Sequence, residues 1–261
     1  MTIFRREMRS SLRSVLLWGL SISAVVVIIM GLFPRVERRA NLFTQMLSGL
    51  ELLTMALGID KLEYATPMGF YGMEAGNIIS LGGALFAGIT GISLLAKEEG
   101  RHTSEFLMSH PVSRFWVVTQ KLMALVLQIV LLNLIFFGFA FVAFSLVARP
   151  INMQELLNLH LAMTMMMVQI GCMMFGISAL LRRESPALGI GIPLMFYFFN
   201  VLLNLNTELK FLRYVTPHYY AEAGKIIGGS IPWHFVQVGG LTALVFLLVG
   251  YIRYLTKDLA I

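Results

Sequence analysis

The sequence predicts an all-α membrane protein with six transmembrane helices, on three grounds. The chain of 261 residues is 57% hydrophobic and 13% charged, whereas an ordinary soluble domain is about 25% charged. Its mean hydropathy of +0.78 is too apolar for a solvated globule. Six apolar stretches each have about the 20 residues that a helix needs to cross the hydrocarbon core. We therefore expect a single transmembrane domain over residues 1–261.

The predicted spans are residues 15–33, 77–96, 122–148, 159–181, 187–205 and 235–252. The first is not a cleaved signal peptide, because its apolar run is too long and no small-residue cleavage site follows it. The lone cysteine, Cys172, makes no internal disulfide and is expected to pack in an apolar core.

Basic residues orient the spans. Segments 1–13, 97–121, 182–186 and 253–261 share one side and hold twelve basic and six acidic residues, whereas the other side holds eight of each. The positive-inside rule assigns the first side to the cytoplasm. We expect a multi-pass protein of the cell (cytoplasmic) membrane with both termini cytoplasmic. Because topology explains the net charge of +6, no nucleic-acid partner is expected.

The first thirteen residues are predicted to form a helix that lies in the membrane surface. Phe4, Met8, Leu12 and Val15 recur at helical spacing beside a stripe of three arginines: Arg5, Arg9 and Arg13. An interfacial helix of this kind offers its arginines to anionic lipid or to a protein. A simple positive anchor for the first span explains the same residues.

On the opposite side, external amphipathic helices are expected. Apolar residues repeat at helical spacing over residues 42–57, which predicts a helix on the outer leaflet or capping the bundle. Segment 206–234 is too polar and too rich in proline and glycine to span, so it is predicted to hold short surface helices with tyrosines in the aromatic belt.

A polar patch over residues 97–114 separates the second and third spans. Two glutamates begin a predicted short helix over 98–110, where Arg101 and Glu105 form an i, i+4 pair. Pro111 ends this helix, and Ser113 or a neighbour caps the next one. Since apolar residues stand among the charges, the patch is expected to contact another protein rather than only the membrane interface.

This patch resembles the signature of ABC-2 type permeases, the membrane subunits of ABC transporters. The matching residues are Glu98, Glu99, Gly100, Thr103, Glu105, Phe106, Leu107, Pro111, Val112, Ser113, Arg114 and Lys121. One departure is His102, which stands before Thr103 where relatives commonly have glycine. The resemblance extends to the six-span layout and covers most of the chain.

The resemblance implies a half-transporter. Two permeases pair, either as identical copies or as paralogues, and each docks an ABC ATP-binding subunit through a cytoplasmic coupling helix between spans two and three. The residues so implied in docking are Glu98, Glu99, Gly100, Arg101, Thr103, Glu105, Phe106, Leu107, Pro111 and Arg114. No cofactor is expected in this chain, and ATP and Mg²⁺ are expected in the partner.

Missing motifs exclude several other classes. The sequence has no G-x-x-x-x-G-K-[ST] loop for phosphate. Its predicted spans carry no mid-membrane Asp, Glu, Lys or Arg, which disfavours an ion-coupled carrier. Neither a G-x-S-G motif nor an E-E-x-x-x-R motif is present, so an intramembrane protease is disfavoured. The histidines have no i, i+3 or i, i+4 spacing for a metal site.

The resemblance places the transport path along spans two and five, where Gly88, Phe196, Phe199 and Asn200 are predicted to border it. The expected function is export of a hydrophobic or amphipathic compound, such as an antimicrobial peptide or drug, powered by the partner's ATP hydrolysis. The alternatives are a membrane scaffold that docks an ATPase without transport, and a sodium-extruding permease.

Overall fold

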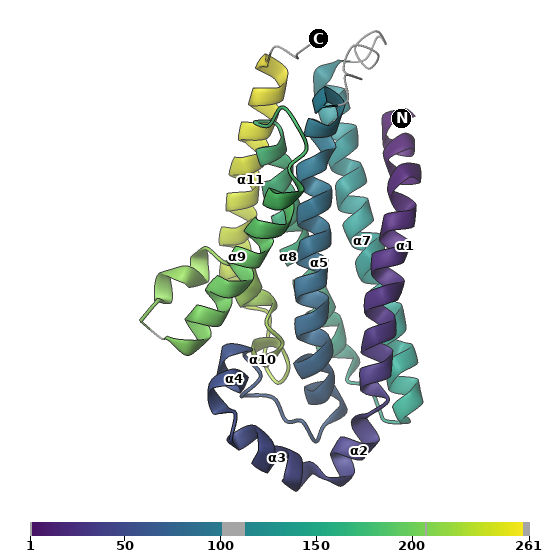
Figure 1. The fold of residues 1–261 in the computed structure, drawn as a ribbon, viewed down its shortest axis with the longest axis vertical. Coiled ribbons are helices and arrows are strands. Elements are labelled where there is room, and N and C mark those ends of the chain that lie inside the picture. Colours follow the sequence, from purple (N-terminus) through teal and green to yellow (C-terminus); the bar gives the residue numbers. More distant parts are fainter. Residues whose placement is uncertain (1, 101–112, 207, 258–261) are drawn as a thin grey trace.

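The computed structural model describes residues 2–100, 113–206 and 208–257, and it contains helices and no strands within those ranges (Figure 1). Six helices are long and apolar enough to cross a membrane. These helices are α1 (Thr2–Met30), α5 (Pro67–Gly100), α7 (Arg114–Val147), α8 (Met153–Ser178), α9 (Pro186–Leu205) and α11 (Trp233–Thr256). The predicted all-α class and the six spans are confirmed.

The long helices form one bundle. In Figure 1, α5 runs through the middle, with α8 behind it, α1 and α7 on one flank, and α9 and α11 on the other. The beginning of α1 and the end of α11 lie at the same end of the bundle, which we call the termini end. The end of α5 and the beginning of α7 lie there too, so the described residues of the polar patch, 97–100 and 113–114, belong to this end. The opposite end is called the far end.

Short helices occupy the connections toward the far end. Between α1 and α5 these are α2 (Phe33–Arg38), α3 (Ala40–Ser48) and α4 (Glu51–Ala56). Between α9 and α11 they are η1 (Lys210–Tyr214), η2 (Pro217–Ala221) and α10 (Ala223–Ile226). The helix predicted over 42–57 is thus broken in two at Gly49, although its apolar residues are exposed on one side as an interfacial face requires.

The prediction of a separate surface helix over residues 1–13 is wrong. Residues 2–30 form one continuous helix, α1, because no proline or glycine interrupts the chain before Gly19. Its buried face carries Ile3, Glu7 and Val15, whereas Leu12 of the predicted apolar face is 47% exposed. Arg5, Arg9 and Arg13 are exposed, as predicted, but they flank a helix that continues directly into the first span.

Several helices extend beyond their predicted spans. Helix α5 begins ten residues before Asn77, and the Thr66 hydroxyl accepts a hydrogen bond from Gly69 N–H at 3.1 Å in its first turn. Helix α7 begins at Arg114, where the Ser113 hydroxyl accepts from Trp116 N–H at 3.3 Å and confirms the predicted cap. Hydropathy marks only the apolar stretch, whereas internal backbone hydrogen bonding carries a helix on into polar sequence.

Glycines allow the central helices to approach closely. A Cβ on Gly91 of α5 would lie 2.6 Å from the carbonyl oxygen of Gly171 in α8. A Cβ on Gly250 of α11 would lie 2.8 Å from Cα of Gly176 in α8. Small residues of this kind bring helix backbones together in membranes, where dispersion contacts replace the hydrophobic effect. Helix α8 is therefore held against both α5 and α11 by backbone contact.

We expect Gly250→Leu to destabilise the bundle, because the new side chain would separate α11 from α8. Overpacking of this kind typically costs about 1–3 kcal/mol, which would be measured as a lower thermal midpoint of the purified protein in detergent. Gly138→Leu is the matched control, since a Cβ at Gly138 would meet no atom within 4 Å. Equal midpoints for the two variants would contradict the close packing.

Candidate functional site

The predicted docking residues fall into three groups. Arg101, Thr103, Glu105, Phe106, Leu107 and Pro111 lie outside the described residues. Glu98, Glu99 and Gly100 form the last turn of α5. Helix α5 therefore continues through the predicted helix start at Glu98, and the rest of the helix predicted over 98–110 lies outside the described residues. Arg114 is the first residue of α7.

A cluster of three charged side chains ties the end of α5 to α1 and α7; we call it the Glu7 clamp. Glu7 of α1 is 3% exposed and pairs with Lys97 of α5. The Nζ of Lys121 in α7 lies 3.7 Å from Glu7 Oε1 and donates to the Leu94 carbonyl oxygen at 2.5 Å. Because Lys121 is fully buried, both its charge and its ammonium hydrogens need these partners.

A second set of contacts, the Lys257 clamp, ties the beginning of α7 to the last helix. The Arg114 guanidinium donates to the carbonyl oxygen of Lys257 at 2.8 Å. The Lys257 ammonium in turn donates to the Leu181 carbonyl oxygen, just beyond α8, at 2.8 Å. Cationic side chains commonly satisfy the free carbonyls at helix C-termini. The clamp therefore joins α7, α8 and α11.

The two clamps flank segment 101–112 in the sequence. Lys97 precedes the segment by four residues, and Arg114 follows it by two. The Glu7 clamp connects Lys97 to α1, and the Lys257 clamp connects Arg114 to α8 and α11. The residues that flank the segment are therefore connected to α1, α7, α8 and α11 through polar contacts that are buried or partly buried.

Sequence reasoning did not identify Glu7 or Lys257 as parts of this site, and it placed Lys97 in the polar patch without assigning it a partner. Lys121 was recognised only as a residue of the family signature. The available signal was Glu7 itself, which is the only acidic residue among four arginines in the first thirteen residues. A single carboxylate in so basic a helix indicates a specific cationic partner, but the partners lie 90 and more residues away.

The predicted path residues lie at the packed contact of α5 and α9. A Cβ on Gly88 would overlap the Gly189 carbonyl oxygen and the Pro193 ring. Phe196 and Asn200 are buried, and Phe199 is half-buried against the core. Whether they border a transport path stays a prediction.

Asn200 belongs instead to a polar cluster toward the far end. Its Nδ2 and that of Asn204 donate to Glu222 Oε2 at 2.9 and 3.2 Å. Lys225 Nζ lies 2.6 Å from the same oxygen. Burial lowers the pKa of Lys225, and the Glu222 carboxylate opposes that shift. The cluster attaches segment 206–232 to the end of α9.

A small cavity of about 20 Å³ adjoins this cluster, and its lining includes Ser80, Asn200 and His218. Ser80 Oγ lies 2.9 Å from Nδ1 of His218, whose side chain is 3% exposed. In the described part of the chain, His218 Nε2 and Asn200 Oδ1 have no hydrogen-bond partner. Such a space accommodates one water molecule. Burial lowers the pKa of His218 to about 3, so the imidazole is neutral at pH 7.

The other buried histidine is fully hydrogen-bonded. The two ring nitrogens of His160 in α8 lie 3.0 Å from Asn133 Oδ1 and 2.9 Å from the Tyr71 hydroxyl. Since the amide oxygen only accepts, Nδ1 carries the proton and Nε2 accepts from Tyr71. The ring therefore joins α5, α7 and α8 as a structural contact. The described residues contain no group of three or more His, Cys, Asp or Glu side chains placed to hold a metal ion.

A comparison with protein families finds a match over almost the whole chain. The family model described as ABC-2 family transporter protein covers residues 1–259. No curated protein matches the chain.

Breaking the Glu7 clamp is expected to destabilise the bundle. Glu7→Leu would leave the buried Lys121 ammonium without its carboxylate, and removing one partner of a buried pair typically costs about 3–5 kcal/mol. The double variant Glu7→Leu/Lys121→Met should recover most of that loss, because well-packed apolar side chains often replace a buried pair at little cost. Thermal midpoints of the wild type, Glu7→Leu, Lys121→Met and the double variant would measure the coupling between the two side chains. A double variant as unstable as the sum of the two single variants would contradict it.

Acid is expected to weaken the fold through His218. The unfolded histidine takes up a proton near pH 6.5, whereas the folded one does so only near pH 3. The contribution of this group to stability is therefore full above pH 6.5 and falls by about 1.4 kcal/mol per unit as the pH drops toward 3. Between pH 7 and pH 5, the thermal midpoint of the His218→Gln variant should therefore fall less than that of the wild type. Parallel pH profiles would show that His218 does not titrate in this way.

Proposed function

Because the chain belongs to the ABC-2 transporter family, we propose that it is the permease subunit of an ATP-driven exporter. The chain is a multi-pass membrane transport component, and its family works with ABC ATP-binding subunits. In our proposal such a subunit docks on residues 98–114, with both termini on the cytoplasmic side of the cytoplasmic membrane. ATP and Mg²⁺ bind in that subunit.

The observation that carries this proposal is the position of the two clamps. If the residues that flank segment 98–112 made no contact with other helices, movement of a docked ATPase would move only the segment. Instead, the Glu7 clamp and the Lys257 clamp join its two ends to α1, α8 and α11. Movement of a docked ATPase would tilt several helices together, which is what switching a transport path requires.

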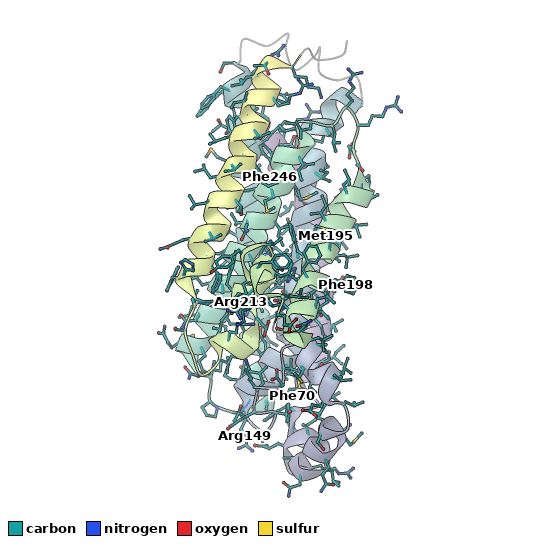
Figure 2. All side chains as sticks on the ribbon, turned by 90° about the vertical axis from the view of Figure 1, so that its left-hand side faces the viewer. Phe70, Arg149, Met195, Phe198, Arg213 and Phe246 are labelled. Carbon is teal, nitrogen blue, oxygen red and sulfur yellow. The ribbon has the colours of Figure 1, made fainter. Side chains whose placement is uncertain are left out.

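We propose a hydrophobic or amphipathic cargo, such as an antimicrobial peptide or a drug. Helix α9 carries no charged residue and exposes apolar side chains along its length. Met195 and Phe198, at 42% and 58% exposure, point outward from it in Figure 2. A second permease, either another copy or a paralogue, would cover this face and enclose a path with apolar walls.

Reversing the charges at Glu98 and Glu99 tests the docking surface. We expect Glu98→Lys/Glu99→Lys to lose the co-purifying ATPase in mild detergent, or to lose cargo-stimulated ATP hydrolysis by at least about tenfold, because complementary charges at interfaces set partner binding. The six helices should still insert. Glu51→Lys/Glu208→Lys makes the same charge change at exposed positions toward the far end and serves as the control.

Each outcome separates the candidate functions. Retention of the ATPase together with full cargo-stimulated hydrolysis in the Glu98/Glu99 variant would overturn docking at this segment. An ATPase that binds wild type, but that no hydrophobic compound stimulates, would favour the scaffold. Stimulation by Na⁺ in its place would favour sodium extrusion.

A further inference from the structure

A groove of about 250 Å³ runs between α8 and α11. Met165 and Val168 line it on α8, Val236, Gly240 and Ala243 line it on α11, and Tyr220 of η2 lines it as well. Helix α11 lies on the flank of the bundle and exposes Leu241 and Leu244 beside the groove. In a membrane the side of α11 that exposes these leucines faces lipid, so the groove is open to acyl chains.

The polar groups in the groove wall are already paired with one another. The Tyr220 hydroxyl donates to Gln169 Oε1 at 2.7 Å, and Gln169 Nε2 donates to the Thr242 hydroxyl at 3.1 Å. Thr164 donates to the carbonyl oxygen of His160 at 2.8 Å. Since these side chains satisfy each other, the groove presents a hydrocarbon-like wall and has no need of a polar ligand.

An arginine stands near the Tyr220 side of this groove. Arg213 of η1 has its Cζ 5.9 Å from the centre of the Tyr219 ring, and its Nε is buried with no hydrogen-bond partner among the described residues. Lys225 Nζ lies 4.3 Å from the same ring and is neutralised by Glu222. No carboxylate in the described ranges is paired with Arg213. The positive charge of its guanidinium is therefore not neutralised by any of those residues.

Ring contacts connect the arginine to the groove. Tyr219 packs against Phe235 with ring centroids 4.8 Å apart. The next residue after each of these, Tyr220 and Val236, lines the groove. Figure 2 shows Arg213 beside the beginning of α11, and Figure 1 shows that α11 begins well short of the far end of α5. Arg213 therefore lies alongside the bundle, at the depth of an interface rather than beyond it.

We propose that this site binds one anionic phospholipid of the leaflet nearer the far end. The phosphate pairs with the Arg213 guanidinium, and an acyl chain fills the groove between α8 and α11. A phosphate supplies both the negative charge and the acceptor oxygens that the guanidinium lacks. The exposed rings of Tyr214 and Trp233 near the arginine are typical of residues at headgroup level. This inference does not depend on which cargo the protein moves.

Native mass spectrometry of the delipidated full chain, titrated with phosphatidylglycerol, tests this site. Arg213→Gln removes the charge, and Gly240→Leu fills the groove without strain, since a Cβ there would meet no atom within 4 Å. We expect each variant to weaken lipid retention by about tenfold. The controls are Arg39→Gln, at an exposed arginine that follows α2, and Gly191→Leu, at an exposed helix glycine with equal space. Both controls should stay within about twofold of wild type.

The proposal fails if either Arg213→Gln or Gly240→Leu retains phosphatidylglycerol as wild type does. It also fails if millimolar inorganic phosphate displaces the lipid completely, because the acyl chain would then contribute nothing. Unchanged thermal midpoints of the two variants in lipid-free detergent would show that both proteins are folded, so that a loss of retention reports binding.

Discussion

Close backbone contact between α8 and its neighbours is the constraint on which the rest of the structure depends. Water drives no helix association inside a membrane, so helices associate where small residues let backbones touch. Gly171 and Gly176 place α8 directly against α5 and α11. This contact sets the depth at which the polar residues of all three helices meet. The hydrogen bonds of His160 and Gln169 are possible only because the helices are already this close.

The two ends of the bundle use charge in different ways. At the termini end, lysines and an arginine bind carbonyl oxygens at helix ends and one buried carboxylate, so the helices are joined to one another. Toward the far end, Glu222 holds a folded-back segment against α9 through Asn200 and Asn204. Between these ends the side chains in contact are mainly apolar. The polar contacts at the two ends would therefore couple the movement of one helix to that of its neighbours, whereas the apolar contacts in the middle would let the helices shift against each other.

The six spans could be predicted from sequence because a run of about 20 apolar residues has few other uses. The Ser113 cap could also be predicted, since its signal is local. The buried face of residues 2–13 could not be predicted, because the burial of Glu7 depends on Lys97 and Lys121, which are far away in the chain. A helical wheel of the first thirteen residues treats Glu7 as exposed and Leu12 as buried, and the structure reverses both. The same limit applies to Lys257, whose partner Leu181 is 76 residues away.

The position of Glu7 also sets an order of assembly. Residues 2–13 are synthesised before α5 and α7, but their only acidic side chain has its two cationic partners in those helices. Until Lys97 and Lys121 have both been synthesised, this carboxylate lacks part of the partner set that accompanies its burial in the finished protein. Helix α1 therefore reaches its final place only after α7 has begun to form, although it is made before α7. A chain truncated before α7 would insert α1 without fixing its rotation or depth.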